Sequence, residues 1–92
     1  MGLAPPAKPY TVRLHFAERE QLKAGQRVFD VYLQRQKVLE AFDIVKQSGG
    51  SRIPVTREIP AVHVTDELHV ELHPTSDTVR LPVLSGIEIV RE

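Results

Sequence analysis

The chain has 92 residues, 41% of them hydrophobic and 26% charged, so it is a single small globular domain and not a disordered segment. Twelve basic residues balance twelve acidic ones, which excludes a net field that would attract nucleic acid or an anionic membrane. The chain has no cysteine, which excludes disulfides and thiolate chemistry, and no apolar run is long enough to span a bilayer.

We expect residues 1–9 to form a disordered or extended lead-in and residues 10–92 to form the domain. Pro5, Pro6 and Pro9 keep this entry extended, because each proline fixes its own φ and restricts the residue before it. The lead-in has no apolar core of the kind found in a signal peptide.

The first strand is predicted at Tyr10 to Phe16, where Val12, Leu14 and Phe16 alternate with polar residues. Residues 18–26 are polar and contain a glycine, so they are predicted to form a loop. The alternation then resumes in residues 27–34, whose apolar positions 29, 31 and 33 again share one face. Each of these two strands therefore has one buried face.

The next turn is predicted at Gln34 to Gln36, before a short strand at residues 37–39. A two-residue hairpin turn needs positive φ, which Gln34 and Arg35 adopt only with strain, so the turn is either longer or mildly strained. Residues 41–45 are a further strand-like run. The glycine and serine residues of 47–51 predict a flexible surface loop.

Residues 56–64 resume an extended pattern that Pro60 interrupts, which is typical of an edge strand or a bulge. Residues 68–72 alternate again. Between them, Thr65 to Glu67 is predicted to be the loop of a hairpin that joins these two strands.

The closing strand is predicted at residues 83–90, with Ile87 and Ile89 facing inward. About seven strand-like segments and no convincing amphipathic helix indicate an all-β fold, a β-sandwich. The predicted core takes residues from separate strands: Phe16, Phe29, Val31, Val70 and Ile87.

Carboxylates are the first candidates for chemistry, because a glycosidase requires a pair of them. Twelve acids on a small surface bring some pair together by chance, and no histidine lies in a recognisable triad setting. We therefore predict no enzymatic activity and no cofactor. The carboxylates considered are Glu18, Glu20, Asp30, Asp43, Asp77 and Glu88.

The histidines are the second candidates. If residues 64 and 68 pair across the predicted hairpin, His63 and His69 stand opposite each other, near enough to share a metal ion with Glu71 or His73 as a third ligand. The competing interpretation is an outer sheet face on which histidine is simply tolerated. We favour the latter and predict no metal site.

Several blocks occur together: Y-T-V-R-L-H-F-A-E, G-Q-R-V-F-D-V-Y-L, K-V-L, F-D-I-V and L-S-G-I-E-I-V. Their order and spacing, from about Tyr10 to Glu92, resemble the malectin and malectin-like family. This resemblance implies a jelly-roll-like β-sandwich that is truncated at the N-terminal side relative to the longer family domain. Such domains occur in an endoplasmic-reticulum lectin, in receptor-kinase ectodomains and beside bacterial glycoside hydrolases, so the resemblance also implies an extracytoplasmic location.

The resemblance implies a non-catalytic carbohydrate-binding or accessory module of the glycoside-hydrolase-associated type. One residue after F-A-E the family has an aromatic pair, and those positions hold Glu20 and Gln21 here, which can hydrogen-bond to hydroxyls but cannot stack. An acidic site residue of the family corresponds loosely to Asp77. Weak or lost glycan binding by these three residues is therefore the expectation.

The alternative is a structural or protein-interaction module that pairs through an exposed sheet edge. If strands that complete the family sandwich are lacking, the strand Tyr10 to Phe16 has an unpaired edge beside an apolar face. A homo-oligomer, or pairing with a partner segment, is then expected.

Overall fold

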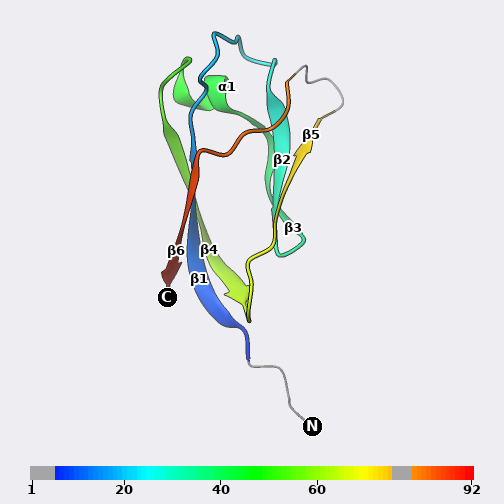
Figure 1. The fold of residues 1–92 in the computed structure, drawn as a ribbon, viewed down its shortest axis with the longest axis vertical. Coiled ribbons are helices and arrows are strands. Elements are labelled where there is room, and N and C mark those ends of the chain that lie inside the picture. Colours follow the sequence, from blue (N-terminus) through cyan, green and yellow to red (C-terminus); the bar gives the residue numbers. More distant parts are fainter. Residues whose placement is uncertain (1–5, 76–79) are drawn as a thin grey trace.

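The computed structural model describes residues 6–75 and 80–92, which contain six strands and one short helix (Figure 1). The one helix is too short to cross a membrane, and no other helix occurs among the described residues. In chain order the elements are β1 (Lys8–Phe16), β2 (Val28–Leu33), β3 (Gln36–Asp43), α1 (Ile44–Ser48), β4 (Val55–Val64), β5 (Val70–Pro74) and β6 (Gly86–Arg91).

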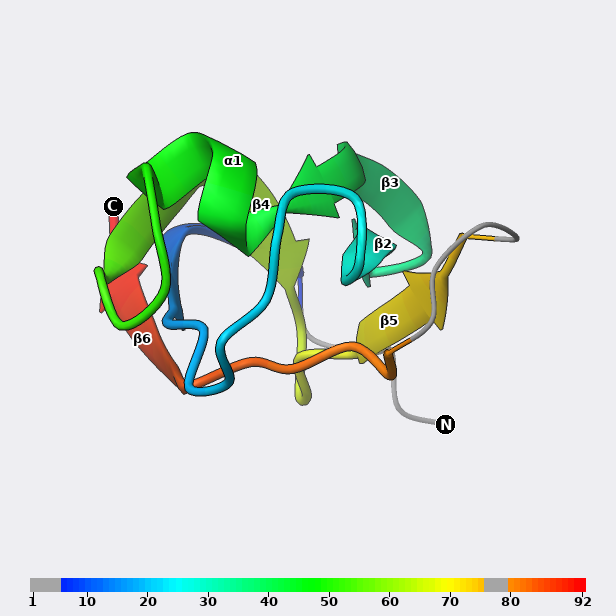
Figure 2. The same ribbon diagram turned by 90° about the horizontal axis from the view of Figure 1, so that it is seen from above.

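The strands form two antiparallel sheets of three strands, in the orders β4-β1-β6 and β3-β2-β5. Figure 2 shows the two sheets side by side, and Figure 1 shows α1 at one end of the sandwich. β1 and β2 are the central strands, and their buried faces meet in a common core. The predicted all-β sandwich is confirmed.

The alternation in β1 and β2 produces this core. Val12 and Leu14 are fully buried, and Phe16 meets Phe29 and Phe42 in a cluster of three rings. Ring centroids in this cluster lie 4.5 to 6.0 Å apart in tilted and edge-on arrangements, which aromatic pairs favour. Val70, also predicted for the core, is partly buried and packs against it.

β1 has hydrogen-bonded neighbours on both sides, so the expectation that its edge is unpaired is wrong. Its two partners, β4 and β6, are the edges of this sheet instead. The pairing with β4 shifts register between Tyr10 and Val12, where Pro60 and Ala61 interrupt the partner strand and Ala61 has a φ of 57°. The predicted irregularity at Pro60 on an edge strand is confirmed.

The turn between β2 and β3 has two residues, Gln34 with φ 50° and Arg35 with φ 65°. Such a turn matches the twist of a hairpin but disfavours residues that carry a Cβ. Of the two alternatives, the tight and strained turn is therefore present. Gln34 has a compensating role, because its side-chain amide donates to the carbonyls of His63 and Glu67 at 3.1 and 3.2 Å.

Residues 41–45 are not one strand. They contain the end of β3, which bends at Ala41 with φ 47°, and the start of α1. Asp43 caps this helix by accepting a hydrogen bond from the Lys46 N–H at 3.2 Å, and Gly49, with φ 90°, ends it. Part of the predicted flexible loop at 47–51 is therefore helix, and the two predicted runs 37–39 and 41–45 largely merge into β3.

β4 and β5 do not form the predicted hairpin. β5 pairs with β2 in the second sheet, so residues 65–69 cross from one sheet to the other. His63 consequently lies on β4 and His69 just before β5, and they are not cross-strand neighbours. The hairpin prediction failed because alternation identifies strands but not the partners with which they pair.

Ile87 and Ile89 of β6 pair with Leu14 and Val12, so they share the inward face of β1 as predicted. However, they remain 40% and 49% exposed, and Ile87 does not belong to the core. These two side chains stay exposed because β6 pairs with β1 at the edge of its sheet, and no strand of the second sheet packs against β6 to a comparable extent. Val90, on the other face of β6, is 41% exposed.

Candidate functional site

The long connection between β1 and β2, residues 17–27, carries two of the three predicted site residues. Glu20 and Gln21 both lie in this connection and are exposed. Asp77 lies outside the described residues. Its role in carbohydrate binding therefore stays a prediction.

A buried ion pair fixes this connection at both of its ends. Glu18, 1% exposed, follows β1, and Arg27, 7% exposed, precedes β2. Arg27 Nε donates to Glu18 Oε1 at 2.7 Å, and Nη2 donates to Oε2 at 3.1 Å. This two-pronged geometry is the strongest arrangement that arginine forms with a carboxylate.

The pair also determines the ionisation of Glu18. Burial alone would raise the pKa of the Glu18 carboxyl, but hydrogen bonds from Arg27 and the N–H groups of Arg19 and Glu20, with the charge of Arg27, hold that pKa below its usual value. The hydrogen bonds to Glu18, together with its charge, raise the pKa of Arg27 against the opposing effect of burial. Both groups are therefore charged near neutral pH.

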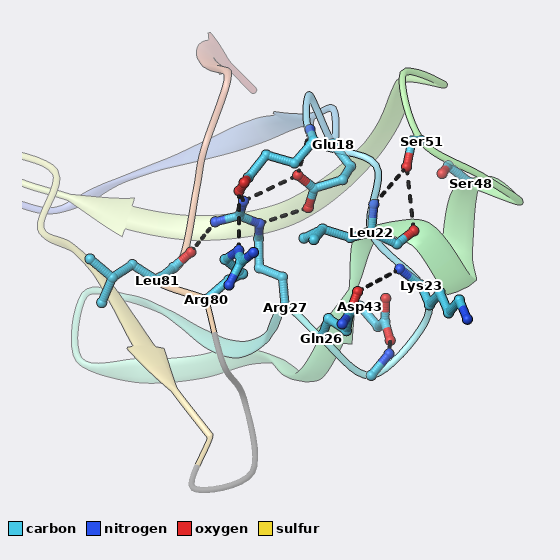
Figure 3. A network of polar contacts seen from close by, with 12 residues as sticks. Glu18, Leu22, Lys23, Gln26, Arg27, Asp43, Ser48, Ser51, Arg80 and Leu81 are labelled. Carbon is cyan, nitrogen blue, oxygen red and sulfur yellow. Dashed lines mark hydrogen bonds and ion pairs between the residues drawn. The ribbon is translucent and has the colours of Figure 1, made fainter.

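Arg27 connects this pair to the segment before β6 (Figure 3). Its Nη1 donates to the carbonyl of Leu81, and its Nη2 donates to Glu20 Oε2 at 2.6 Å. Arg80 Nε lies 3.5 Å from the same oxygen of Glu20. One guanidinium thus joins two segments that are far apart in the sequence.

The other side of the connection is anchored near α1. Leu22 is buried, and its N–H and carbonyl both bond the Ser51 hydroxyl, at 3.3 and 3.4 Å. The Gly25 N–H donates to Asp43 Oδ2 at 2.6 Å, which gives the helix-capping carboxylate a second partner. The connection is therefore a fixed part of the fold although it has no regular secondary structure.

A cavity of about 390 Å³ opens beside the ion pair. Glu20 lines it, whereas Gln21 does not, so the structure brings only one of the two described candidates to the cavity. Its lining combines charged groups with a small apolar wall from Val83 and Leu84 and includes no aromatic ring among the described residues. The described residues that line it are 17–20, 27 and 83–85.

The histidines do not form the metal site that was considered. Within residues 6–75 and 80–92, no group of three or more histidine, aspartate or glutamate side chains is arranged to hold a metal ion. Glu71 of β5 lies 3.6 Å from His69, which precedes the strand, and 3.1 Å from His73, so these side chains form exposed polar contacts.

A second candidate surface is the free edge of β6. The Glu92 N–H donates to the Pro9 carbonyl at 3.3 Å. In an antiparallel pair the backbone groups alternate in direction, so every second residue counted back from Glu92 faces β1. The residues between them, Ile87, Ile89 and Arg91, direct their N–H and C=O groups toward the free edge.

The remaining sheet edges are interrupted. β4 contains Pro60 and the bulge at Ala61, and β5 is only five residues long and ends at Pro74. β3 bends at Ala41, whose N–H is taken by Asp30 Oδ1 at 2.8 Å. Prolines, bulges and short strands are the usual means of preventing edge pairing. Among the described edge strands, β6 alone contains no proline, no register shift and no residue with positive φ.

Sequence reasoning missed the Glu18–Arg27 pair, although a signal was present. Glu18 stands two residues after Phe16, so it has the same inward-facing parity as residues 12, 14 and 16. Arg27 stands two residues before Phe29, so it has the parity of residues 29, 31 and 33. Two opposite charges at inward-facing positions next to consecutive strands predict a buried ion pair, because burying a single charge without a partner costs too much free energy.

We compared the chain with known protein families and with known proteins. The family model of the Malectin domain matches residues 4–87. A probable receptor-like protein kinase of Arabidopsis thaliana is 34% identical over 93 residues, covering 89% of this chain and 11% of that protein. The nodulation receptor kinase of Pisum sativum is 35% identical over 92 residues, covering 99% and 10%.

Solved structures give the same fold. In the crystal structure of the plant peptide RALF23 with FER and LLG2, one chain matches with a TM-score of 0.83 and 26% identity, over 99% of this chain and 26% of that one. The ANX2 ectodomain of Arabidopsis thaliana matches with a TM-score of 0.80 and 22% identity, over 97% and 27%.

The sequence relatives are receptor kinases, and this chain spans about a tenth of their length. The expected association with glycoside hydrolases finds no support among them. The match of the family model over residues 4–87, together with these relatives, shows that the chain belongs to the Malectin domain family.

Proposed function

We propose that this chain is a non-catalytic, extracytoplasmic recognition module that binds an extended polypeptide segment by adding it as a strand beside β6. The observation that carries the proposal is the open edge of β6, where Ile87, Ile89 and Arg91 direct their backbone groups outward. The half-exposed side chains of Ile87 and Ile89 lie on the same strand.

These two features complement each other in strand addition. The main-chain hydrogen bonds supply affinity for any extended segment, and the side chains at alternate positions supply selectivity. A partner strand with apolar residues opposite Ile87 and Ile89 would extend the inward face of the sheet. A cation opposite Glu88 would favour the same strand on the outer face.

The relatives support polypeptide recognition outside the cytoplasm. One match is a chain of the crystal structure of the plant peptide RALF23 in complex with FER and LLG2, and another is the ANX2 ectodomain. The buried carboxylate of Glu18 is engaged by Arg27 on both oxygens, which favours a structural role over acid–base catalysis.

The test uses a fluorescein-labelled, terminally blocked peptide with the core Val-Thr-Val-Lys-Val. We expect Ile89→Pro to weaken binding at least about tenfold, which corresponds to ~1.4 kcal/mol. Proline removes a donor that faces away from β1, so no hydrogen bond within the sheet is lost. Fluorescence anisotropy measures the binding, and the thermal midpoint of the variant should stay close to that of the parent.

The matched control is Ile53→Ala, which shortens a hydrophobic side chain that is 44% exposed and lies in the connection between α1 and β4. It should leave the affinity unchanged. Equal binding of the peptide to the parent and to Ile89→Pro would refute strand addition at β6, and weakened binding by Ile53→Ala would indicate non-specific hydrophobic contact.

Glycan binding is the second candidate, supported by family membership and by the position of Glu20 on the cavity. In this proposal Glu20, Gln21 and Asp77 bind sugar hydroxyls without an aromatic platform. Affinity should then be millimolar or weaker, at most ~4–5 kcal/mol. Calorimetric titration with neutral oligosaccharides measures it, and a micromolar ligand would overturn the expectation of weak binding.

A further inference from the structure

We infer that the strand received by β6 is the β6 strand of a second copy of this chain, antiparallel to the first and centred on Ile89. This inference rests on the function proposed above and names the partner for the same edge. It produces a continuous six-stranded sheet in the order β4-β1-β6, then β6-β1-β4 of the second copy.

The hydrogen-bonding phase of β6 fits this pairing. With Ile89 opposite Ile89 of the second copy, each Ile87 is opposite an Arg91, and all these residues have outward backbone groups. The result is three hydrogen-bonded pairs, each with two N–H···O=C bonds. The inward faces of both copies stay on the same side, so Ile89 meets Ile89 of the second copy, and each Ile87 lies opposite an Arg91, whose aliphatic stem can cover it.

Two neighbouring registers also pair the outward backbone groups of the two copies and keep their inward faces on one side. Both are less favourable than the register centred on Ile89. A shift in one direction places Glu88 directly opposite Glu88 of the second copy, and a shift in the other places it opposite Glu92. Like charges directly opposite each other destabilise an antiparallel pair. In the register centred on Ile89, Glu88 is opposite Val90 and keeps its 2.6 Å contact with His15 Nε2.

The assembly closes at two copies. A two-fold axis uses the open edge of both chains, and the devices on β3, β4 and β5 oppose further pairing. The equal numbers of basic and acidic residues provide no overall repulsion against association.

The test uses the absence of natural cysteine. Glu88 and Val90 of opposite copies form a non-hydrogen-bonded pair in the inferred register, with Cα atoms roughly 4.5 Å apart, within the range that a disulfide spans. We expect a mixture of Glu88→Cys and Val90→Cys chains to form a covalent dimer under mild oxidation. Each variant alone should crosslink no faster than Ile53→Cys, which reports random collision.

Non-reducing electrophoresis measures crosslinking, and sedimentation of the parent chain should show a reversible dimer that Ile89→Pro abolishes. Crosslinking of Glu88→Cys alone or of Val90→Cys alone would contradict the register. A parent that stays monomeric at high concentration, with no crosslinking in the mixture, would overturn self-pairing. If the Val-Thr-Val-Lys-Val peptide still bound, strand addition would stand with another partner; if it did not, both proposals would fail.

Discussion

Replacing Glu18 with glutamine should lower the free energy of unfolding by about 3–5 kcal/mol, because it removes the buried counter-ion of Arg27 and leaves only the half-exposed carboxylate of Glu20 beside that buried charge. Arg27 is 7% exposed and donates to both oxygens of Glu18. Small domains have total stabilities of about 5–15 kcal/mol, so a loss of this size would bring the chain near unfolding at room temperature. Urea denaturation followed by circular dichroism measures the change.

The matched control is Glu20→Gln, since Glu20 contacts the same guanidinium at 2.6 Å but its side chain is 51% exposed. Its cost should stay below about 1 kcal/mol. Similar losses for both variants would contradict the assignment of Glu18 as the residue that neutralises Arg27.

The same pair predicts a pH dependence. The pKa of Glu18 is lower in the folded chain than in the unfolded chain, so its stabilising contribution is complete above the unfolded pKa. That contribution is lost as the pH falls through the folded pKa. Glu18→Gln should therefore lose less stability than the parent between neutral and acidic pH, in the same denaturation experiment.

Replacing Phe29 with alanine should cost about 3–5 kcal/mol, because it leaves a cavity at the centre of the sandwich. Phe29 is fully buried, and its ring packs against those of Phe16 and Phe42, with centroids 5.9 and 6.0 Å away. Its removal affects both sheets, since Phe16 belongs to β1 and Phe42 to β3.

Thermal denaturation of Phe29→Ala measures this loss, and Leu81→Ala is the control. The Leu81 side chain is 77% exposed, so its truncation should change stability by no more than about 0.5 kcal/mol. A Phe29→Ala chain that melts within a few degrees of the parent would contradict the central position of this ring.

The core could be predicted from the sequence because alternation states which residues share a face. Val12, Leu14 and Phe16 are buried as expected, since β1 is covered on that face. The same alternation placed Ile87 and Ile89 on the correct face of β6 but could not show that the face is uncovered there. Burial of a strand face depends on which strand of the other sheet packs against it, and the sequence of the strand itself does not show this.

Strand pairing and the short helix were also not predicted correctly from the sequence. The predicted hairpin of residues 56–72 joined two strands that lie in different sheets, because a short polar loop is compatible with a turn or with a crossing. The cap residues of α1, Asp43 and Gly49, were visible in the sequence. A helix of five residues, however, is too short to show a helical period.

The candidate site was predictable only in part. Glu20 was identified through the family resemblance and lies on the cavity, but Glu18 and Arg27, which organise the cavity wall, were missed. The open edge was expected on the wrong strand. Identifying β6 required the strand order, which places β1 at the centre of its sheet.

Amide hydrogen exchange on β6 tests the account most directly, at a chain concentration where sedimentation shows monomer. Without peptide, the amides that face β1, those of Glu88 and Val90, should be protected, and those of Ile87, Ile89 and Arg91 should exchange quickly. Saturation with the Val-Thr-Val-Lys-Val peptide should protect the latter three. Peptide binding that leaves these three amides exchanging quickly and protects residues 17–27 instead would contradict strand addition at β6.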